Sequence, residues 1–296
     1  MSKKLGLGIT FLLLGGLIWY LFLKPSDYIV RFNSNAIPGT LNQEIKLWAN
    51  SLENSEFIEQ NDLANFVHHF KFNDSVHRYE WFIKPLNDSM SKIKVTIKDM
   101  DHSLQNRINI PFIDTDFEKR TKKNLTDCMT IIKEHTEKFK VTIIGESTVE
   151  SKFHAFVPIK SAQKEKALKM MENYSFLNSV LVRNGIQLDG QPFIQVNDWS
   201  IEKDSISYNF CYPIIEPDTL PEIKGLQFKK LKEKRAIKAI YNGNYITSDR
   251  AWYHLLEYAE RNNIAIERKP LEIFYTNPNM RGNELDWKAE IFMPLE

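Results

Sequence analysis

The sequence contains few cysteines, which argues against a disulfide-stabilised fold. Its 296 residues include two cysteines, Cys128 and Cys211, and we expect them to lie in different domains. A disulfide between them is therefore not expected, and the fold must depend on the burial of apolar side chains. No stretch is of low enough complexity to predict disorder.

Spaced motifs of catalytic and metal sites are absent. The sequence has no HExxH, CxxC or His-x-His spacing, no GxSxG elbow, no P-loop and no GxGxxG. His68 and His69 are adjacent in a predicted strand, so their rings should point to opposite faces and cannot bind one ion together. We therefore predict no metal, no cofactor and no catalytic residue that a motif would mark.

A large excess of charge is also absent. The 39 basic and 38 acidic residues give a formal net charge of +1, which does not favour a nucleic-acid partner. One basic run, residues 224–238, is diluted by acidic residues such as Glu233 and has no helix-turn-helix, zinc or aromatic RNA-binding motif beside it. We interpret it as the solvated face of a connecting strand and predict that the chain does not bind nucleic acid.

One long apolar run is present near the start of the chain. Residues 5–23 carry no charge, and the run ends at Lys24 and Pro25. A helix needs roughly 20 residues to cross a bilayer, whereas the apolar core of a signal peptide is about 7–15 residues and precedes a small-residue cleavage site. No such site follows, and no cysteine suited to a lipid anchor does either, so we predict an uncleaved single-pass anchor.

The charges around this run predict its orientation. Lys3 and Lys4 precede the run, whereas Lys24 after it is close to Asp27. The positive-inside rule then places residues 1–4 in the cytoplasm as a short tail and the domains after the anchor outside it.

About 270 residues follow the anchor, too many for one ordinary core, so two domains are expected. In the first, residues 27–144, we predict an α+β arrangement in which a helix begins at Pro38 and a long helix closes the domain. The predicted strands are residues 27–32, 65–72, 77–85 and 92–99. This order resembles the helix-grip fold of the START-like (SRPBCC) superfamily, in which a long C-terminal helix closes on a curved antiparallel sheet.

The long closing helix has the clearest local signals. Thr115 and Glu118 have the spacing of a capping box. Apolar residues then recur at helical spacing up to about residue 139: Phe117, Leu125, Met129, Ile132 and Phe139. Residues 138–150 would form a linker or a strand shared by the two domains.

The end of the chain, residues 266–295, predicts a hairpin. Residues 271–275 and 287–293 form its strands, Asn277, Pro278 and Asn279 form its turn, and Pro294 ends it. Residues 186–214 show a similar pattern, and aligning Pro192 with Pro270 places Asn209 opposite Glu290. Predicted helices at about 161–183 and 248–262 precede the two copies. The sequence therefore predicts a duplicated strand–helix–hairpin unit.

The second copy, with AIKAIYNGNY at residues 236–245 and WKAEIFMPL at residues 287–295, resembles the GyrI-like effector-binding domain. That domain is the ligand-sensing half of several bacterial transcription activators (AraC-type and BmrR-like) and also occurs alone. The resemblance covers roughly residues 145–296 and departs at Asn244, where the family often has proline. It implies a small-molecule pocket with a glutamate at the position of Glu290.

Glu290 is the principal candidate for a ligand contact. A carboxylate inside an apolar strand costs several kcal/mol if it is buried without a partner. It could attract a cationic or aromatic ligand, it could be neutralised by Lys288 on the same face, or it could be exposed on an edge strand. Aromatic residues in strands more often belong to a hydrophobic core than to a pocket. Those that could form the walls of such a pocket are Phe274, Tyr275, Trp287, Phe292, Tyr245 and Trp252.

These observations favour a membrane-anchored small-molecule-binding protein over an enzyme. Activators of the family have a helix-turn-helix where this chain has an anchor and a sheet domain, which argues against direct gene regulation. Two alternatives stay open. One is a GyrI-like hydrolase of small electrophilic compounds with Glu290 as the base, and the other is a non-catalytic interaction module of the cell envelope.

Overall fold

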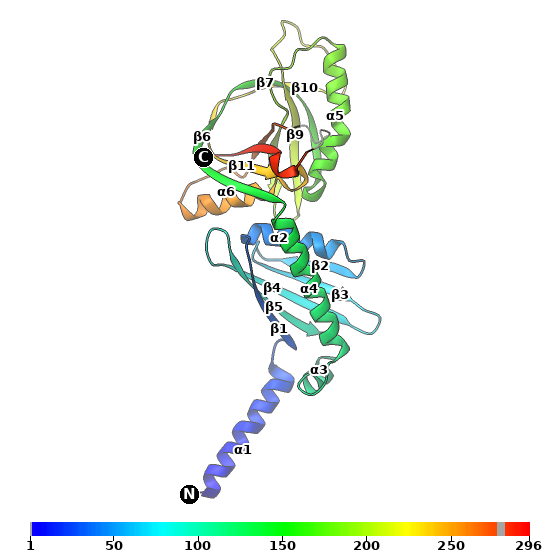
Figure 1. The fold of residues 1–296 in the computed structure, drawn as a ribbon, viewed down its shortest axis with the longest axis vertical. Coiled ribbons are helices and arrows are strands. Elements are labelled where there is room, and N and C mark those ends of the chain that lie inside the picture. Colours follow the sequence, from blue (N-terminus) through cyan, green and yellow to red (C-terminus); the bar gives the residue numbers. More distant parts are fainter. Residues whose placement is uncertain (1, 277–281) are drawn as a thin grey trace. The chain divides into compact units, whose positions relative to one another are not determined.

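The computed structural model describes residues 2–276 and 282–296, which form two compact units, Met1–His135 and Thr136–Glu296 (Figure 1). The turn predicted at Asn277, Pro278 and Asn279 lies outside the described residues. The division between the units falls before the predicted boundary at residues 144 and 145. Strand β6 (Phe139–Val149) thus lies within the second unit and is not a linker.

The first unit begins with a continuous apolar helix. Helix α1 (Ser2–Ile18) continues into a short π-helix, η1 (Trp19–Leu23) (Figure 1). Residues 5–23 have a mean hydropathy of 2.0 and are, by length and composition alone, sufficient to cross a membrane.

Arg107 on α3 (Ser103–Asn109) holds the end of this helix. Its guanidinium donates hydrogen bonds to the main-chain oxygens of Leu21 at 3.0 Å and Lys24 at 2.6 Å. Its Nε lies 2.6 Å from the Asp27 carboxylate, and Arg107 and Asp27 are both buried. A cation at the C-terminal end of a helix satisfies carbonyls that have no partner within the helix. The connection between the apolar helix and the first sheet is therefore fixed by specific contacts.

The sheet of the first unit has five antiparallel strands in the order β1-β5-β4-β3-β2. Its strands are β1 (Tyr28–Ser34), β2 (Ser55–Gln60), β3 (Asn65–Lys71), β4 (Val76–Pro85) and β5 (Ser91–Asp99). The strands predicted from sequence correspond to β1, β3, β4 and β5 and are confirmed, whereas β2 and α3 were not predicted.

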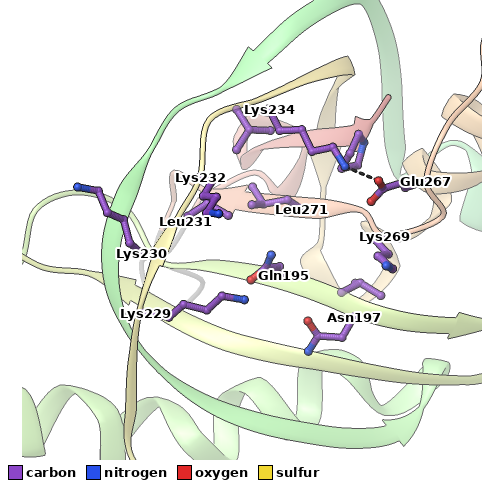
Figure 2. A pocket seen from close by; sticks show the side chains of 13 residues that line it. Gln195, Asn197, Lys229, Lys230, Leu231, Lys232, Lys234, Glu267, Lys269 and Leu271 are labelled. Atoms are coloured by element: carbon purple, nitrogen blue, oxygen red, sulfur yellow. Dashed lines mark hydrogen bonds and ion pairs between the residues drawn. The ribbon is translucent and has the colours of Figure 1, made fainter. Parts of the chain in front are cut away.

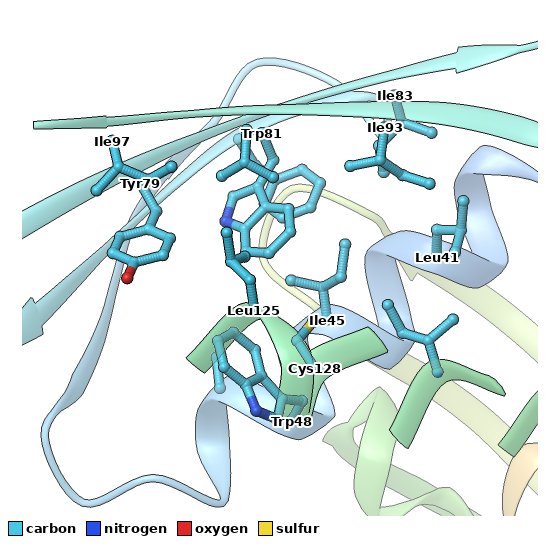
Figure 3. Packing of buried hydrophobic residues seen from close by; sticks show 14 of the residues in the cluster. Leu41, Ile45, Trp48, Tyr79, Trp81, Ile83, Ile93, Ile97, Leu125 and Cys128 are labelled. Atoms are coloured by element: carbon cyan, nitrogen blue, oxygen red, sulfur yellow. The ribbon is translucent and has the colours of Figure 1, made fainter. Parts of the chain in front are cut away.

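Two helices, α2 (Pro38–Asn50) and α4 (Asp116–Thr136), bury one face of this sheet. Trp48 of α2 meets Trp81 of β4 edge to face, with ring centroids 6.2 Å apart, and Leu125 and Cys128 of α4 complete the same cluster (Figure 3). Each of these side chains is at most 2% exposed. The stability of the unit therefore depends on aromatic packing between helix and sheet.

The long helix α4 agrees with its predicted start but not with its predicted end. The Glu118 N–H donates to Thr115 Oγ1 at 3.1 Å, which is the N-terminal half of a capping box. The helix ends at Thr136, so the prediction that Phe139 belongs to it is wrong: Phe139 begins β6, whose residues pair with β11 (Lys234–Gly243). Met129 is 40% exposed and does not lie on the buried face.

The second unit is built on an eight-stranded antiparallel sheet in the order β10-β7-β9-β8-β12-β13-β11-β6. Besides β6 and β11, its strands are β7 (Lys152–Ala162), β8 (Phe193–Ser200), β9 (Ser205–Pro213), β10 (Gln227–Leu231), β12 (Leu271–Phe274) and β13 (Lys288–Pro294). With helices α5 (Lys166–Arg183) and α6 (Arg250–Arg261), the whole chain has the predicted α+β architecture. The first helix begins later than predicted because residues 161 and 162 belong to β7.

The strand order shows two copies of one unit. The segments β7–α5–β8–β9 and β11–α6–β12–β13 follow each other along the chain, and their strands mirror each other about the β8–β12 pair. Asn209 on β9 and Glu290 on β13 occupy equivalent strands, since each strand pairs with the other two strands of its copy. The predicted equivalence of these two residues is confirmed.

Helices α5 and α6 cover the same face of the second sheet. Helix α5 contacts β7 and β9, and α6 contacts β6, β11 and β13. Lys166 Nζ of α5 lies 5.1 Å from the ring centroid of Trp252 of α6. Among the described residues, no helix packs on the opposite face, which we call the open face.

The sheet bends toward its open face. The pairing of β6 with β11 slips between Lys238 and Ala239, opposite Gly145, whose φ of 98° is rarely adopted by residues with a side chain. A short connection after Val149 joins the end strand β6 to β7, and another after Leu231 joins the end strand β10 to β11. Val149, Leu231 and Lys234 consequently line one common cavity.

Candidate functional site

The open face of the second sheet holds a cavity of about 560 Å³. Figure 2 shows it between the strands β8, β10 and β12 and the segment before β12. The residues that line it are Val149, Gln195, Val196, Asn197, Lys229, Lys230, Leu231, Lys232, Lys234, Glu267, Lys269, Leu271 and Pro294. This volume is in the range of small-molecule sites.

The floor of the cavity is apolar. Leu271 and Val149 are buried at 3% and 5% exposure, and Leu231 packs against the same cluster. Successive strand residues point to opposite faces, so alternate positions of β12 and β10 supply this floor while the residues between them face away. The cavity can therefore cover the apolar part of a ligand.

The rim of the cavity is rich in lysine. Five lysines line it, against a single acidic residue, Glu267. Glu267 forms an ion pair with Lys234 that holds the pKa of its carboxyl below the usual value. In Figure 2, Lys229 extends into the cavity toward Gln195, whereas Lys230 points away from it.

Gln195 lies at the centre of the floor, directly opposite Leu271 in the pairing of β8 with β12. Its Oε1 is buried and has no hydrogen-bond partner among the described residues. An unsatisfied buried polar atom is costly, and an amide can present either its oxygen or its NH2 group. Gln195 is therefore available to hydrogen-bond a ligand or a water molecule.

Glu290 lies on the same open face, outside the cavity lining. Each oxygen of its carboxylate forms an ion pair with a lysine: Lys288 Nζ is 2.8 Å from Oε1 and Lys238 Nζ is 2.9 Å from Oε2. The Tyr275 hydroxyl donates to Oε2 at 2.9 Å. Glu290 is thus a neutralised group, in line with the predicted alternative in which Lys288 balances its charge.

The pKa of Glu290 follows from these contacts. Partial burial by itself would raise the pKa of the carboxyl, but the hydrogen bonds from Lys288, Lys238 and Tyr275 outweigh it and lower the pKa below its usual value. Burial of the ring, together with its hydrogen bond to the same carboxylate, raises the pKa of Tyr275 to about 12. A general base works best with a pKa near the operating pH, so a lowered pKa makes Glu290 a weaker base.

The other predicted site residues fall into three groups. Phe292 and Tyr275 share the open face with Glu290. The Phe292 ring centroid is 5.1 Å from Lys238 Nζ, and the Tyr275 ring centroid is 4.7 Å from Lys288 Nζ. Tyr245, Phe274 and Trp287 form a separate aromatic cluster, in which the Tyr245 ring is 4.9 Å from Phe274 and 5.8 Å from Trp287.

Trp252 forms the third group alone. It belongs to α6, is 0% exposed and packs edge to face on Trp199 of β8, on the helix-covered face of the sheet. Three of the seven predicted residues, Glu290, Phe292 and Tyr275, are therefore together on the open face, and the others belong to the covered side of the unit or to its end.

A buried ion pair was missed by the sequence interpretation. Lys166 Nζ of α5 lies 2.8 and 3.0 Å from the two carboxylate oxygens of Glu272 on β12, and it also donates to Ser248 Oγ at 2.6 Å. Both residues are at most 1% exposed. Glu272 has the same signal that drew attention to Glu290, a carboxylate inside an apolar strand, whereas nothing in the sequence distinguishes Lys166.

The basic run at residues 224–238 also lies beside the cavity, which the sequence interpretation missed. It forms β10 and the start of β11, and four of its lysines line the cavity: Lys229, Lys230, Lys232 and Lys234. Lys229, Lys230 and Lys232 are exposed, as the prediction of a solvated face expects, but the sequence did not indicate that they border a cavity. Their assembly with Lys269 depends on the bend of the sheet, which no local pattern indicates.

Within residues 2–276 and 282–296, no three histidine, cysteine or acidic side chains are grouped to hold a metal ion. Glu267, which lines the cavity, and Glu290, on the same open face, already have lysine partners. The arrangement suits non-covalent binding by apolar contact and by charge.

Residues 161–296 match the family model of the GyrI-like small molecule binding domain. This part of the chain is therefore a GyrI-like small-molecule binding domain. No curated protein matches the chain. Residues 27–144, for which the sequence predicts a START-like domain, lie outside this match.

Similar solved structures also cover about the second half of the chain. They include the C-terminal domain of EcmrR (17% identity, TM-score 0.44, 53% of this chain and 98% of that one). SAV2435 bound to tetraphenylphosphonium has 11% identity and a TM-score of 0.36, over 53% of this chain and 93% of that one. A hydrolase from Listeria innocua has 12% identity and a TM-score of 0.32, over 55% of this chain and 98% of that one. Likenesses this low carry no conclusion about ligand or activity.

Replacing Glu290 with glutamine should lower the free energy of unfolding by about 1–2 kcal/mol near pH 7, because two lysines lose their partner but can still reach water. Because the pKa of Glu290 is lower in the folded state than in the unfolded state, its carboxylate stabilises the fold fully at pH values above the unfolded pKa. This stabilisation is lost as the pH falls through the folded pKa. The difference between parent and Glu290→Gln should therefore begin to shrink as the pH falls to about 4.3, the unfolded pKa, and vanish only below the lower folded pKa. Urea unfolding at several pH values measures it.

Glu146→Gln is the matched control, since Glu146 pairs with Arg235 and both are well exposed. It should change stability by less than about 0.5 kcal/mol. If Glu290→Gln leaves stability unchanged and selectively lowers the affinity for cationic dyes, Glu290 is an electrostatic ligand anchor instead. A loss of turnover with retained binding would instead favour a hydrolase.

Proposed function

We propose that this chain is a membrane-anchored protein that binds a small ligand on the open face of its second unit. The observation that carries the proposal is the cavity of about 560 Å³ on that face, within a GyrI-like small-molecule binding domain. The apolar floor supplies burial, and Gln195 and the lysines supply polar contacts. The domains after the anchor face the side of the membrane opposite the short tail of residues 1–4.

The Glu-centred aromatic pocket belongs to this proposal in a narrower form. Glu290, Tyr275 and Phe292 extend the binding surface along the open face, with the charge of Glu290 balanced by Lys238 and Lys288. Phe274, Tyr245, Trp287 and Trp252 support the strands and helix ends behind that surface.

We also propose that residues 27–144 are a START-like (SRPBCC) domain. A strand, a helix, four further strands, the short helix α3 and a long closing helix follow each other in this order, and the first strand lies beside the last at the edge of the sheet. The long helix α4 packs on the sheet through Leu125, Cys128 and Ile132. In this proposal, the unit links the anchor to the ligand-binding domain.

Ligand binding can be tested on the full chain in non-ionic detergent by calorimetry. We would titrate phenylbutyrate, phenylbutylamine and phenylbutanol, which share one apolar body and differ in the charge of the head group. At least one should bind. Gln195→Trp places an indole at the centre of the cavity and should weaken that binding by more than about tenfold, because the apolar floor is then covered.

Gln187→Trp is the matched control, because Gln187 is exposed and does not line the cavity. It should bind like the parent chain. The proposal fails if none of the probes binds, or if Gln195→Trp, folded as judged by circular dichroism, binds them all as tightly as the parent.

A further inference from the structure

We infer that the cavity is selective for an organic anion: an apolar body carrying a carboxylate or phosphate head. This inference rests on the proposed function of the cavity and specifies the charge of its ligand. The lysines of the rim would surround the head, while Leu231, Leu271 and Val149 would cover the apolar body.

The balance of charges at the open face is the first reason. Glu267 and Glu290 both already have lysine partners, and Glu290 has two. A cationic ligand would have to displace a lysine to reach either carboxylate. Glu290 therefore offers little net attraction to a cation, although a neutralised carboxylate can still accept a hydrogen bond.

The unpaired lysines are the second reason. Among the described residues, Lys229, Lys232 and Lys269 line the cavity without a salt-bridge partner. They come from three places in the chain, β10, the turn after it and the segment before β12, and only the bend of the sheet brings them together. Like charges gathered at one concave site repel one another, and an anion would relieve that repulsion.

The amide of Gln195 is the third reason. Figure 2 shows it between Lys229 and Leu271, at the boundary of the lysine rim and the apolar floor. Its buried oxygen has no partner among the described residues, and the same amide carries an NH2 group that can donate a hydrogen bond to an anionic head. A donor at this depth fixes where the head lies.

The three phenylbutyl probes test this selectivity directly on the full chain. At about pH 7 and low salt, phenylbutyrate should bind roughly tenfold more tightly than phenylbutanol, and phenylbutylamine should bind most weakly. Raising the salt should reduce the preference, because partly exposed charges are screened.

Combining Lys229→Gln, Lys232→Gln and Lys269→Gln should make the three affinities equal within about twofold. The matched control combines Lys160→Gln, Lys164→Gln and Lys203→Gln, which remove the same charge from exposed lysines outside the cavity. This control should retain the preference for phenylbutyrate.

The outcomes separate this inference from the proposed function. If phenylbutylamine binds most tightly, or if the three probes bind equally to the parent, the anion inference is wrong while ligand binding stands. If the control variant loses the preference as fully as the cavity variant, the preference arises from net charge and the inference is also wrong. If no probe binds, the proposed function fails as well.

An acidic lipid head group and a free organic acid share the chemistry inferred here. Adding phosphatidylglycerol to the detergent micelles should displace phenylbutyrate if the site reaches lipid, whereas phosphatidylcholine should not. If neither lipid displaces it, the natural ligand is a free organic anion. Either result is compatible with an anion site and identifies its source.

Discussion

Replacing Glu272 with glutamine is expected to lower the free energy of unfolding of the second unit by about 3–5 kcal/mol, because it strands a buried cation. Lys166 is 1% exposed, and its ammonium lies within 3.0 Å of both Glu272 oxygens. A glutamine can accept one hydrogen bond from it but cannot balance its charge. Lys166 also cannot reach water without moving helix α5.

This effect can be measured by hydrogen–deuterium exchange of peptides from α5 and α6 in increasing denaturant, since these report on the second unit alone. Glu172→Gln is the matched control, because Glu172 pairs with Lys169 on the surface of α5. An exposed pair of this kind contributes at most about 1 kcal/mol.

Combining Lys166→Met with Glu272→Leu should recover most of the lost stability, because apolar residues of similar size often replace a buried ion pair without cost. The double change thus separates the stranded charge from a loss of packing. A Glu272→Gln chain as stable as the Glu172→Gln control would show that the buried pair does not form.

Alkaline phosphatase fused after Glu296 is expected to be active in a bacterial host, since the reporter folds only outside the cytoplasm. Lys3 and Lys4 precede the apolar helix, and the positive-inside rule places them on the cytoplasmic side. The domains follow the apolar helix along the chain and should therefore lie on the side of the membrane opposite Lys3 and Lys4.

Two controls accompany this fusion. A chain without residues 5–23 should give an inactive reporter, and Lys3→Glu with Lys4→Glu should reduce activity by weakening the charge bias. An inactive fusion together with a fluorescent cytoplasmic reporter at the same position would reverse the orientation. Cleavage of the chain near Lys24 would instead indicate a signal peptide.

Local sequence patterns account for most of the secondary structure. Strand alternation and proline positions located the hairpin of β12 and β13, and the capping box located the start of α4. The end of α4 was misjudged, because Phe139 has the helical spacing but its neighbours pair with β11 instead. A periodic pattern does not distinguish the last turn of a helix from an apolar strand that follows it.

The sequence by itself determined the apolar segment of residues 5–23, the two-copy arrangement and the family of residues 161–296. These depend on composition and on spacing along the chain. It also determined that Glu290 shares a face with Lys288, because residues two apart in a strand point the same way.

Only the tertiary structure decided which charges meet. Lys238 reaches Glu290 from β11, and Lys166 reaches Glu272 from α5 across 106 positions of sequence. Lys229 and Lys269 line one cavity only because the sheet bends. Strand register and sheet curvature come from contacts between distant segments, so no local pattern in a single sequence contains them.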